Sequence, residues 1–134
     1  GNQSDVLWWR SMKLILDTHI FLWALSDPKQ ISAAQRHMIE SRANIVYVSS
    51  ISVAEIMIKA SLGKLDVDFD PSDQMSKAGF EPLDFTVRDA LRLKSLPFHH
   101  RDPFDRMLIS QGLETGIPIL TQDVMFNRYD CRLL

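Results

Sequence analysis

Apolar and polar positions along the chain form blocks that predict strands and helices in alternation. Short apolar runs predict four strands, at residues 13–17, 44–49, 80–85 and 117–121, with a fifth, edge strand at 131–134. Helical spacing predicts helices at 18–25, 32–43, 52–63, 71–79, 86–96 and 103–115, and a short helical turn at 123–127. This alternation indicates an α/β fold with a parallel sheet and helices on both faces.

Length and composition indicate one folded domain. The chain has 134 residues, of which 46% are hydrophobic and 24% charged, as in ordinary globular domains. We expect residues 12–134 to form the domain and residues 1–11 to be a leader or expression remnant. No apolar run reaches the roughly 20 residues that cross a membrane. Cys131 is the one cysteine, so no internal disulfide forms and a cytoplasmic location is expected. The net charge of −2 argues against general attraction to nucleic acid.

Four acidic residues fall at one edge of the predicted sheet. Asp17 ends the first strand, and Asp123 follows the fourth strand by two residues. Glu55 and Asp105 lie near the starts of two helices. In a parallel α/β fold the carboxyl ends of strands and the amino ends of helices share one edge, where ligands bind. We therefore expect all four carboxylates to lie on that edge.

Helical spacing predicts that two of these acids point inward. Glu55 shares a stripe with Ile58 and Leu62, and a second stripe runs from Asp105 through Leu108, Ile109 and Gly112. Anions gathered at a partly buried rim repel one another and lose hydration, and a divalent cation relieves both effects. Oxygen-only ligands favour Mg²⁺ or Mn²⁺ over zinc. Two such ions about 4 Å apart can promote cleavage of a phosphodiester.

The same acids also have structural interpretations. Ser52 and Glu55 fit a capping box. Asp102, Pro103 and Asp105 fit a cap, a first-position proline and an acid that favours the helix dipole. Asp123 fits a cap for the turn that follows. Asp17 is harder to explain in this way, because strands are depleted in aspartate.

Three segments of the chain together resemble the PIN-domain nucleases, and in particular the VapC-type toxins of prokaryotic toxin–antitoxin pairs. They are LILDTHIFLWAL, SSISVAEIMIKASLGKL and HRDPFDRMLISQGLETGIPILTQD. The similarity extends from Met12 to Leu134. It implies a parallel five-stranded sheet in the order 3-2-1-4-5, so that the ends of strands one and four face one crevice.

The resemblance also implies a chemistry and a set of partners. The family's metal-binding acids correspond to Asp17, Glu55, Asp105 and Asp123, and its hydroxyl in T-x-D corresponds to Thr121, which would hold Asp17 or a water. Thr18 offers a similar contact. The implied activity is an Mg²⁺- or Mn²⁺-dependent endoribonuclease that a cognate antitoxin neutralises, with RNA as substrate and a homodimer as the usual assembly. A catalytically inactive PIN-fold protein that keeps only the partner surface is the alternative.

Other side chains have more than one interpretation. His99 and His100 are expected to be solvated loop residues, because zinc requires more ligands. Arg101 and Arg106 flank the acidic edge and would contact an RNA phosphate, or Arg106 would pair with Asp102 or Asp105. Lys59 is expected to pair with Glu55 one turn away.

Two further groups of apolar residues are assigned mainly to packing. Phe21, Leu22, Trp23 and Leu25 are expected in the core or on a dimer or antitoxin surface. Packing roles are expected for Met57, Met75, Met107 and Met125.

Overall fold

The computed structural model describes residues 11–134, so the predicted leader lies outside the described residues except for Ser11. The strands are β1 (Lys13–Leu16), β2 (Ile45–Ser49), β3 (Glu81–Leu83) and β4 (Ile119–Leu120). The α-helices are α2 (Thr18–Ser26), α3 (Ala33–Glu40), α4 (Ser50–Ser61), α5 (Pro71–Ala78), α6 (Val87–Leu91) and α7 (Pro103–Thr115). Three 3₁₀ helices complete the chain: η1 (Pro28–Gln30), η2 (Arg92–Ser95) and η3 (Val124–Arg128).

The sheet is parallel and has the strand order β3-β2-β1-β4. This confirms the predicted α/β class and the order of the first four strands. The predicted fifth strand is reduced to one parallel bridge, between Ile119 and Leu133. The chain end still lies along β4, because Ile119 N donates to the Arg132 carbonyl at 2.8 Å and Leu134 N donates to the Ile119 carbonyl at 2.9 Å. β4 is itself only two residues long, so the edge offers few partners for a regular strand.

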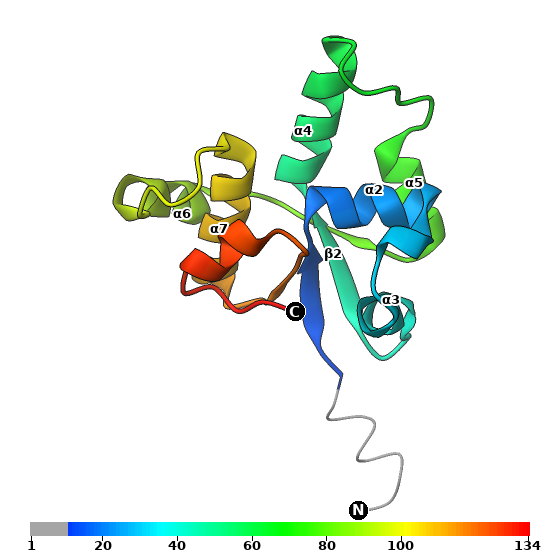
Figure 1. The fold of residues 1–134 in the computed structure, drawn as a ribbon, viewed down its shortest axis with the longest axis horizontal. Helices are drawn as coiled ribbons and strands as arrows, with labels where there is room; N and C mark the ends of the chain where they lie inside the picture. The colour runs from blue at the N-terminus through cyan, green and yellow to red at the C-terminus, as the bar shows by residue number, and fades with distance from the viewer. Residues whose placement is uncertain (1–10) are drawn as a thin grey trace, which may run out of the picture.

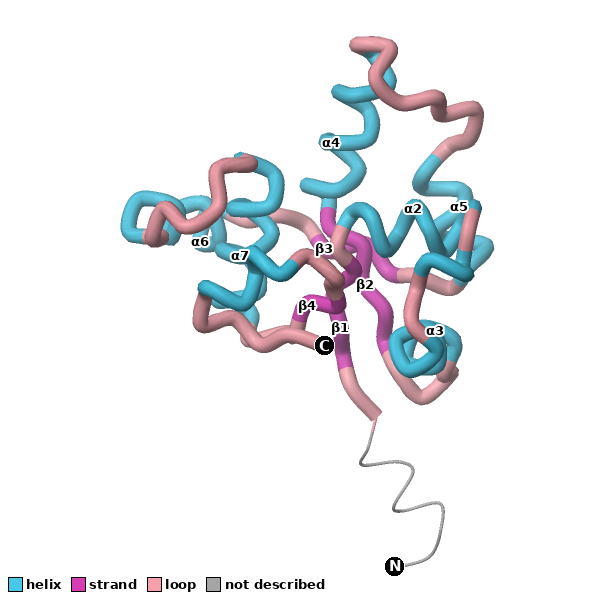
Figure 2. Tube along the Cα trace, viewed as in Figure 1, coloured by secondary structure: helices cyan, strands magenta, loops and turns pink. Residues whose placement is uncertain are grey.

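Helices cover both faces of the sheet, as predicted. α2, α3 and α5 lie on one side, and α6 and α7 lie on the other, with the strands between them (Figures 1 and 2). Successive side chains of β1 point to opposite faces, so Leu14 and Leu16 pack with the first group of helices and Ile15 packs with the second. The central strand is therefore buried on both sides.

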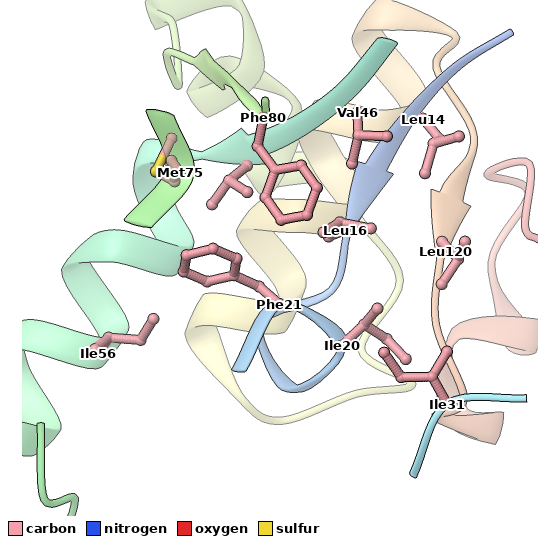
Figure 3. Close-up of a cluster of buried hydrophobic side chains, with 11 residues drawn as sticks. Leu14, Leu16, Ile20, Phe21, Ile31, Val46, Ile56, Met75, Phe80 and Leu120 are labelled. Carbon is pink, nitrogen blue, oxygen red and sulfur yellow. The ribbon is translucent and has the colours of Figure 1, made fainter. Parts of the chain in front are cut away.

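Two clusters of buried apolar side chains stabilise these layers. The first, drawn in Figure 3, comprises Leu14, Leu16, Ile20, Phe21, Ile31, Val46, Val48, Ile56, Met75, Phe80 and Leu120. The second comprises Ile15, Ile51, Leu96, Leu108, Ile109, Ile119, Phe126, Tyr129 and Cys131. Phe21 meets Phe80 edge to face, with ring centroids 6.2 Å apart. The core interpretation thus holds for Phe21, while Leu22, Trp23 and Leu25 are half-buried against the same cluster.

Polar caps fix where the helices near the sheet's carboxyl edge begin. Asp17 caps α2, Ser49 caps α4, and Asp102 caps α7 ahead of Pro103. At the other end of α7, Gly116 has a φ of 70°, a left-handed conformation that glycine adopts without steric strain. These caps hold the starts of three helices beside the ends of β1, β2 and β4.

Some predicted elements differ from the observed ones. α4 begins at Ser50, two residues earlier than predicted, because the Ser49 hydroxyl caps it. The predicted helix at 86–96 divides into α6 and η2. Met57 is 40% exposed, so its predicted packing role is wrong, whereas Met75 is buried. No helix within residues 11–134 is long and apolar enough to cross a membrane.

Candidate metal centre

Asp17 stands at the junction of β1 and α2, where two independent hydrogen bonds hold its carboxylate. Its Oδ1 accepts from the backbone N–H of His19 at 3.3 Å, which caps α2. Its Oδ2 accepts from the Thr121 hydroxyl at 2.7 Å. The side chain is only 3% exposed. An aspartate ends this buried strand because it caps the next helix and meets a hydroxyl from β4.

The end of β4 supplies the second half of this arrangement. Asp17 N donates to the Leu120 carbonyl at 3.0 Å, which joins the two strand ends. The Thr121 hydroxyl that donates to Asp17 also accepts from Asp123 N at 3.0 Å. Asp123 Oδ1 then accepts from Met125 N at 2.9 Å and caps η3. The expected Thr121–Asp17 contact is therefore present, and Asp123 both caps a turn and faces the crevice between β1 and β4.

Glu55 reaches the same edge from α4. The residue is 3% exposed, and its Oε2 accepts from Lys59 Nζ at 2.6 Å. This confirms the predicted pair one helical turn apart, and the bond raises the pKa of the Lys59 amine. The other carboxylate oxygen, Oε1, is buried and has no hydrogen-bond partner within residues 11–134. A buried anionic oxygen without a partner is costly, and a cation bound there would satisfy it.

The predicted inward stripe on α4 is wrong, although Glu55 itself is buried. Ile58 is 45% exposed and Leu62 is 62% exposed, whereas Ser52 and Ile56 are fully buried. The capping box is also wrong, since the helix begins before Ser52. Instead, the Ser52 oxygen accepts from the Thr18 hydroxyl at 2.8 Å. Thr18 therefore uses its hydroxyl to join α2 to α4 and does not use it to hold Asp17.

Asp105 lies in the first turn of α7 at the head of a buried stripe, as predicted. Leu108, Ile109 and Gly112 beneath it are buried. A Cβ added at Gly112 would lie 2.7 Å from Ile119 Cδ1, so the glycine lets α7 pack directly on β4. The backbone N–H of Asp105 donates to Asp102 Oδ1 at 2.9 Å, which confirms the predicted cap.

The carboxylates interact electrostatically across the edge. Burial and the charges of Asp17, Asp102 and Glu55 together raise the pKa of the Asp105 carboxyl to about 7, and the charge of His100 opposes the rise. Burial also raises the pKa of Asp17; the Thr121 hydrogen bond opposes this rise and the charge of Asp123 adds to it. The structure thus brings Asp17 and Glu55 close enough to Asp105, and Asp123 close enough to Asp17, for their charges to raise the pKa values of Asp105 and Asp17. Repulsion of this kind is what a divalent cation relieves.

Sequence reasoning missed one member of the cluster. His100 was expected to be a solvated loop residue, but its Nε2 lies 2.9 Å from Asp105 Oδ2 and 3.2 Å from Asp123 Oδ2. Potential ligand atoms of these three residues all lie within 4.8 Å of one another. Asp17 and Glu55 lie outside that compact group. No local pattern marks His100, since its two partners are 5 and 23 positions away. His99 is exposed, as expected.

Arg106 has neither of its two predicted roles. It is 8% exposed, and its guanidinium donates to the carbonyls of Pro97 at 2.9 Å and Leu96 at 3.2 Å. The guanidinium carbon also lies 4.1 Å above the centre of the Phe98 ring. Arg106 is therefore a structural residue that holds the segment before α7. Arg101 is exposed and remains available to a ligand at this edge.

A surface cavity of about 380 Å³ adjoins the acids. It is lined by Asp17, His19, Ile20, Trp23, Gln122 and Asp123. The rings of His19 and Trp23 lie 5.9 Å apart, centre to centre. The cavity therefore combines two carboxylates with two aromatic rings on α2.

Solved structures with the same fold include several VapBC structures. VapBC2 from Rickettsia felis, bound to a DNA fragment from its promoter, aligns with a TM-score of 0.70 at 17% identity over 92% of this chain and 98% of that chain. DNA-bound VapBC from Salmonella typhimurium aligns with a TM-score of 0.60 at 18% identity over 92% and 97%. VapBC-1 from nontypeable Haemophilus influenzae gives 0.61 at 16% identity over 92% and 97%. At these identities the likeness shows the fold alone.

Sequence comparison identifies the family directly. No curated protein matches the chain in a sequence search. The sequence model of the PIN domain family, however, matches residues 14–131 of this chain. This range includes all four candidate acids, Thr121 and His100. The chain therefore belongs to the PIN domain family.

Proposed function

We propose that this protein is an endoribonuclease that depends on a divalent cation and acts as the toxin of a toxin–antitoxin pair. The observation that carries the proposal is Glu55 Oε1, a buried carboxylate oxygen that has no hydrogen-bond partner among residues 11–134 and whose carboxylate lies close enough to Asp105 to raise the pKa of that acid. Lys59 pairs with only one oxygen of Glu55, so a bound cation would satisfy the other oxygen and reduce the repulsion among the acids. Membership of the PIN domain family supports nuclease chemistry at this edge.

The residues present fit Mg²⁺ or Mn²⁺. All four candidate ligands offer carboxylate oxygens, the donors that these ions prefer. Asp17, Glu55 and Asp105 would hold one ion, and Asp123 would hold a second or orient a water. When bound, such an ion activates water and stabilises charge on the phosphodiester oxygens.

The chain's own groups would orient the acids and the substrate. The Thr121 hydroxyl fixes Asp17 Oδ2 and leaves Oδ1 directed by the weaker contact with His19 N. The cavity beside Asp17 and Asp123 would accept a nucleotide, with the ring of Trp23 available for stacking against a base. Arg101, exposed just before α7, would contact a backbone phosphate.

The solved structures of similar fold support a partner protein. Three of them are VapBC assemblies, two of which are bound to DNA. We assign to this chain a cognate antitoxin as partner, a homodimer as assembly and the cytoplasm as location. Exposed apolar side chains on α4 provide surface for such contacts: Met57, Ile58 and Leu62 are 40%, 45% and 62% exposed.

Cleavage of a mixed RNA panel tests the proposal. We expect cutting with Mn²⁺ or Mg²⁺ that stops with EDTA and leaves 5′-phosphate and 3′-hydroxyl ends. Asp17→Asn should lower the rate by more than about 100-fold, because a ligand to the ion is lost. Its fold should persist, since the asparagine carbonyl still accepts from Thr121.

Asp130→Asn is the matched control, because it makes the same change at an exposed aspartate. This variant should cleave RNA at the wild-type rate. Equal cleavage by the Asp17→Asn variant would refute the role of Asp17. An absence of cleavage by folded wild-type protein with either ion would favour the alternative, an inactive PIN-fold protein that only binds its partner.

A further inference from the structure

The His100 ring is held by its surroundings in one orientation. Its backbone N–H donates to the Tyr129 hydroxyl at 2.7 Å, and that hydroxyl donates to the Pro97 carbonyl at 2.8 Å. The imidazole packs edge to face on Phe126, with centroids 5.9 Å apart at 83°. The side chain is only 14% exposed. A histidine fixed in this way, with its ring edge toward two candidate ligands, has a defined task at the acidic edge.

Hydrogen bonding defines which ring nitrogen carries the proton. Nδ1 accepts from the backbone N–H of Asp102 at 3.2 Å. An accepting ring nitrogen uses its lone pair for the bond, so Nδ1 carries no proton. The ring proton is therefore on Nε2, which faces Asp105 Oδ2 at 2.9 Å and Asp123 Oδ2 at 3.2 Å. Asp123 Oδ2 accepts from this N–H, and Asp105 Oδ2 lies within 2.9 Å of the same nitrogen.

With its proton on Nε2, His100 is a hydrogen-bond donor to the carboxylates and is not in the form that binds a metal ion through Nε2. To coordinate an ion through Nε2, a neutral imidazole must move its proton to Nδ1. A proton on Nδ1 would then face the Asp102 N–H, another donor. Histidines that bind metals usually direct the N–H of their second nitrogen to an acceptor. In His100 the second nitrogen, Nδ1, faces a donor, the backbone N–H of Asp102. The compact group of His100, Asp105 and Asp123 is therefore two carboxylate ligands oriented by one donor.

We propose that His100 is a positioning residue of the candidate metal centre: its Nε2–H fixes the carboxylates of Asp105 and Asp123 in the orientation in which each serves the bound cation or cations, and the imidazole itself does not become a ligand. This inference rests on the proposed cation-dependent function. Asp123 already uses Oδ1 to cap η3 through Met125 N. His100 fixes the opposite oxygen, so the carboxylate of Asp123 cannot rotate freely. The same Nε2 lies 2.9 Å from Asp105 Oδ2, so it also limits the rotation of that carboxylate.

Binding of Mn²⁺ to the purified full chain, followed by electron paramagnetic resonance, tests the assignment. His100→Ala should weaken Mn²⁺ binding by about 10- to 100-fold, the usual effect of losing a group that orients a ligand. His100→Gln should recover most of that loss, because the Nε2 amide group of glutamine can place an N–H near the position of the imidazole Nε2. His99→Ala, on the exposed neighbour, should bind as wild type does. Pulsed spectra of the wild-type complex should show no directly bonded nitrogen.

Several outcomes would overturn the assignment. A directly bonded nitrogen that disappears in His100→Gln would make His100 a ligand. Unchanged or tighter binding by a folded His100→Ala variant would remove the positioning role. So would a glutamine variant that binds as weakly as the alanine variant.

Failure of the metal centre as a whole gives a different pattern. In that case wild-type protein would not bind Mn²⁺, or binding would be insensitive to Asp17→Asn. If Asp17→Asn abolishes binding while His100→Ala does not, only the assignment of His100 falls and the proposed function stands.

Discussion

The Asp105 carboxyl makes the stability of the metal-free protein depend on pH. Burial and the neighbouring acids raise its pKa from an ordinary value of 3.8 to about 7. The folded protein therefore retains a proton on Asp105 at pH values where the unfolded chain has lost it. Stability from this group is fully present below pH 4 and is lost as the pH rises to about 7, by at most about 1.4 kcal/mol for each pH unit.

We predict that EDTA-treated wild-type protein loses about 1–3 kcal/mol more stability between pH 5 and 7.5 than Asp105→Asn does. Urea unfolding at the two pH values measures this difference. The contributions of most other titrating groups are the same in wild type and Asp105→Asn, so they cancel in the comparison. Saturating Mn²⁺ should reduce the difference, since an ion favours the ionised carboxyl. A wild-type protein that gains stability relative to the variant over this range would contradict the raised pKa.

At the residue scale, the sequence predicted those site groups that lie next to element boundaries. Asp17 and Thr121 follow neighbouring strands, and the resemblance to the PIN-domain nucleases implied their contact, which is 2.7 Å long. The contacts of His100 and Thr18 depend on side-chain directions across separate elements, which no spacing along the chain encodes. Glu55 was expected on the correct edge from its place near the start of a helix, but the stripe that was to point it inward is wrong, because Ile58 and Leu62 are exposed.

Among the elements, the segment between η2 and α7 is the one on which the site most depends. Arg106 reaches back from α7 and donates to the carbonyls of Leu96, Pro97 and His100. Because the guanidinium is buried, its removal would leave these carbonyls short of donors. This segment includes His100. The hydrogen bonds from Arg106 therefore fix the position of His100, and with it the candidate ligands that His100 contacts, relative to the start of α7.

We predict that Arg106→Met lowers the free energy of unfolding by about 2–4 kcal/mol and weakens Mn²⁺ binding as well. Arg106→Lys should recover little, because an ammonium cannot match the fork of a guanidinium. Arg101→Met, on an exposed neighbour, should keep stability and Mn²⁺ affinity while it weakens RNA binding. Chemical unfolding and Mn²⁺ titration of the three variants measure these effects. Equal stability of Arg106→Met and wild type would exclude a stabilising role for the Arg106 hydrogen bonds.

Element types were predicted better than element boundaries. The pattern of apolar runs identified all four strands and every α-helix, because periodicity extends over many residues. Boundaries depend on single caps, and choosing Ser52 instead of Ser49 as the cap of α4 shifted the predicted helix by two residues. The fifth strand failed for a different reason: its partner β4 has only two residues, so pairing stops after one bridge.

At the scale of the whole molecule, topology explains the candidate site. β1 and β4 are neighbours in the sheet but far apart in sequence, so the chain leaves their ends in opposite directions and opens a crevice there. Each candidate acid comes to this edge of the sheet from a different element: Asp17 after β1, Glu55 from α4, Asp105 from α7 and Asp123 after β4. A fold-level prediction therefore placed the acids on one edge before any side-chain geometry was known.

The outer face of α4 leads to a prediction about assembly. The far end of the helix stands away from the sheet (Figure 1), and Ile58 and Leu62 there are 45% and 62% exposed. Because both side chains already face solvent, Ile58→Lys with Leu62→Lys should change the free energy of unfolding by no more than about 0.5 kcal/mol. If a second copy covers this face, the double variant should be monomeric in sedimentation where wild type is dimeric, and Val124→Lys, at a residue 73% exposed outside α4, should remain dimeric. A double variant that stays dimeric would exclude the self-association surface, and one that also fails to bind the antitoxin would assign this face to that partner.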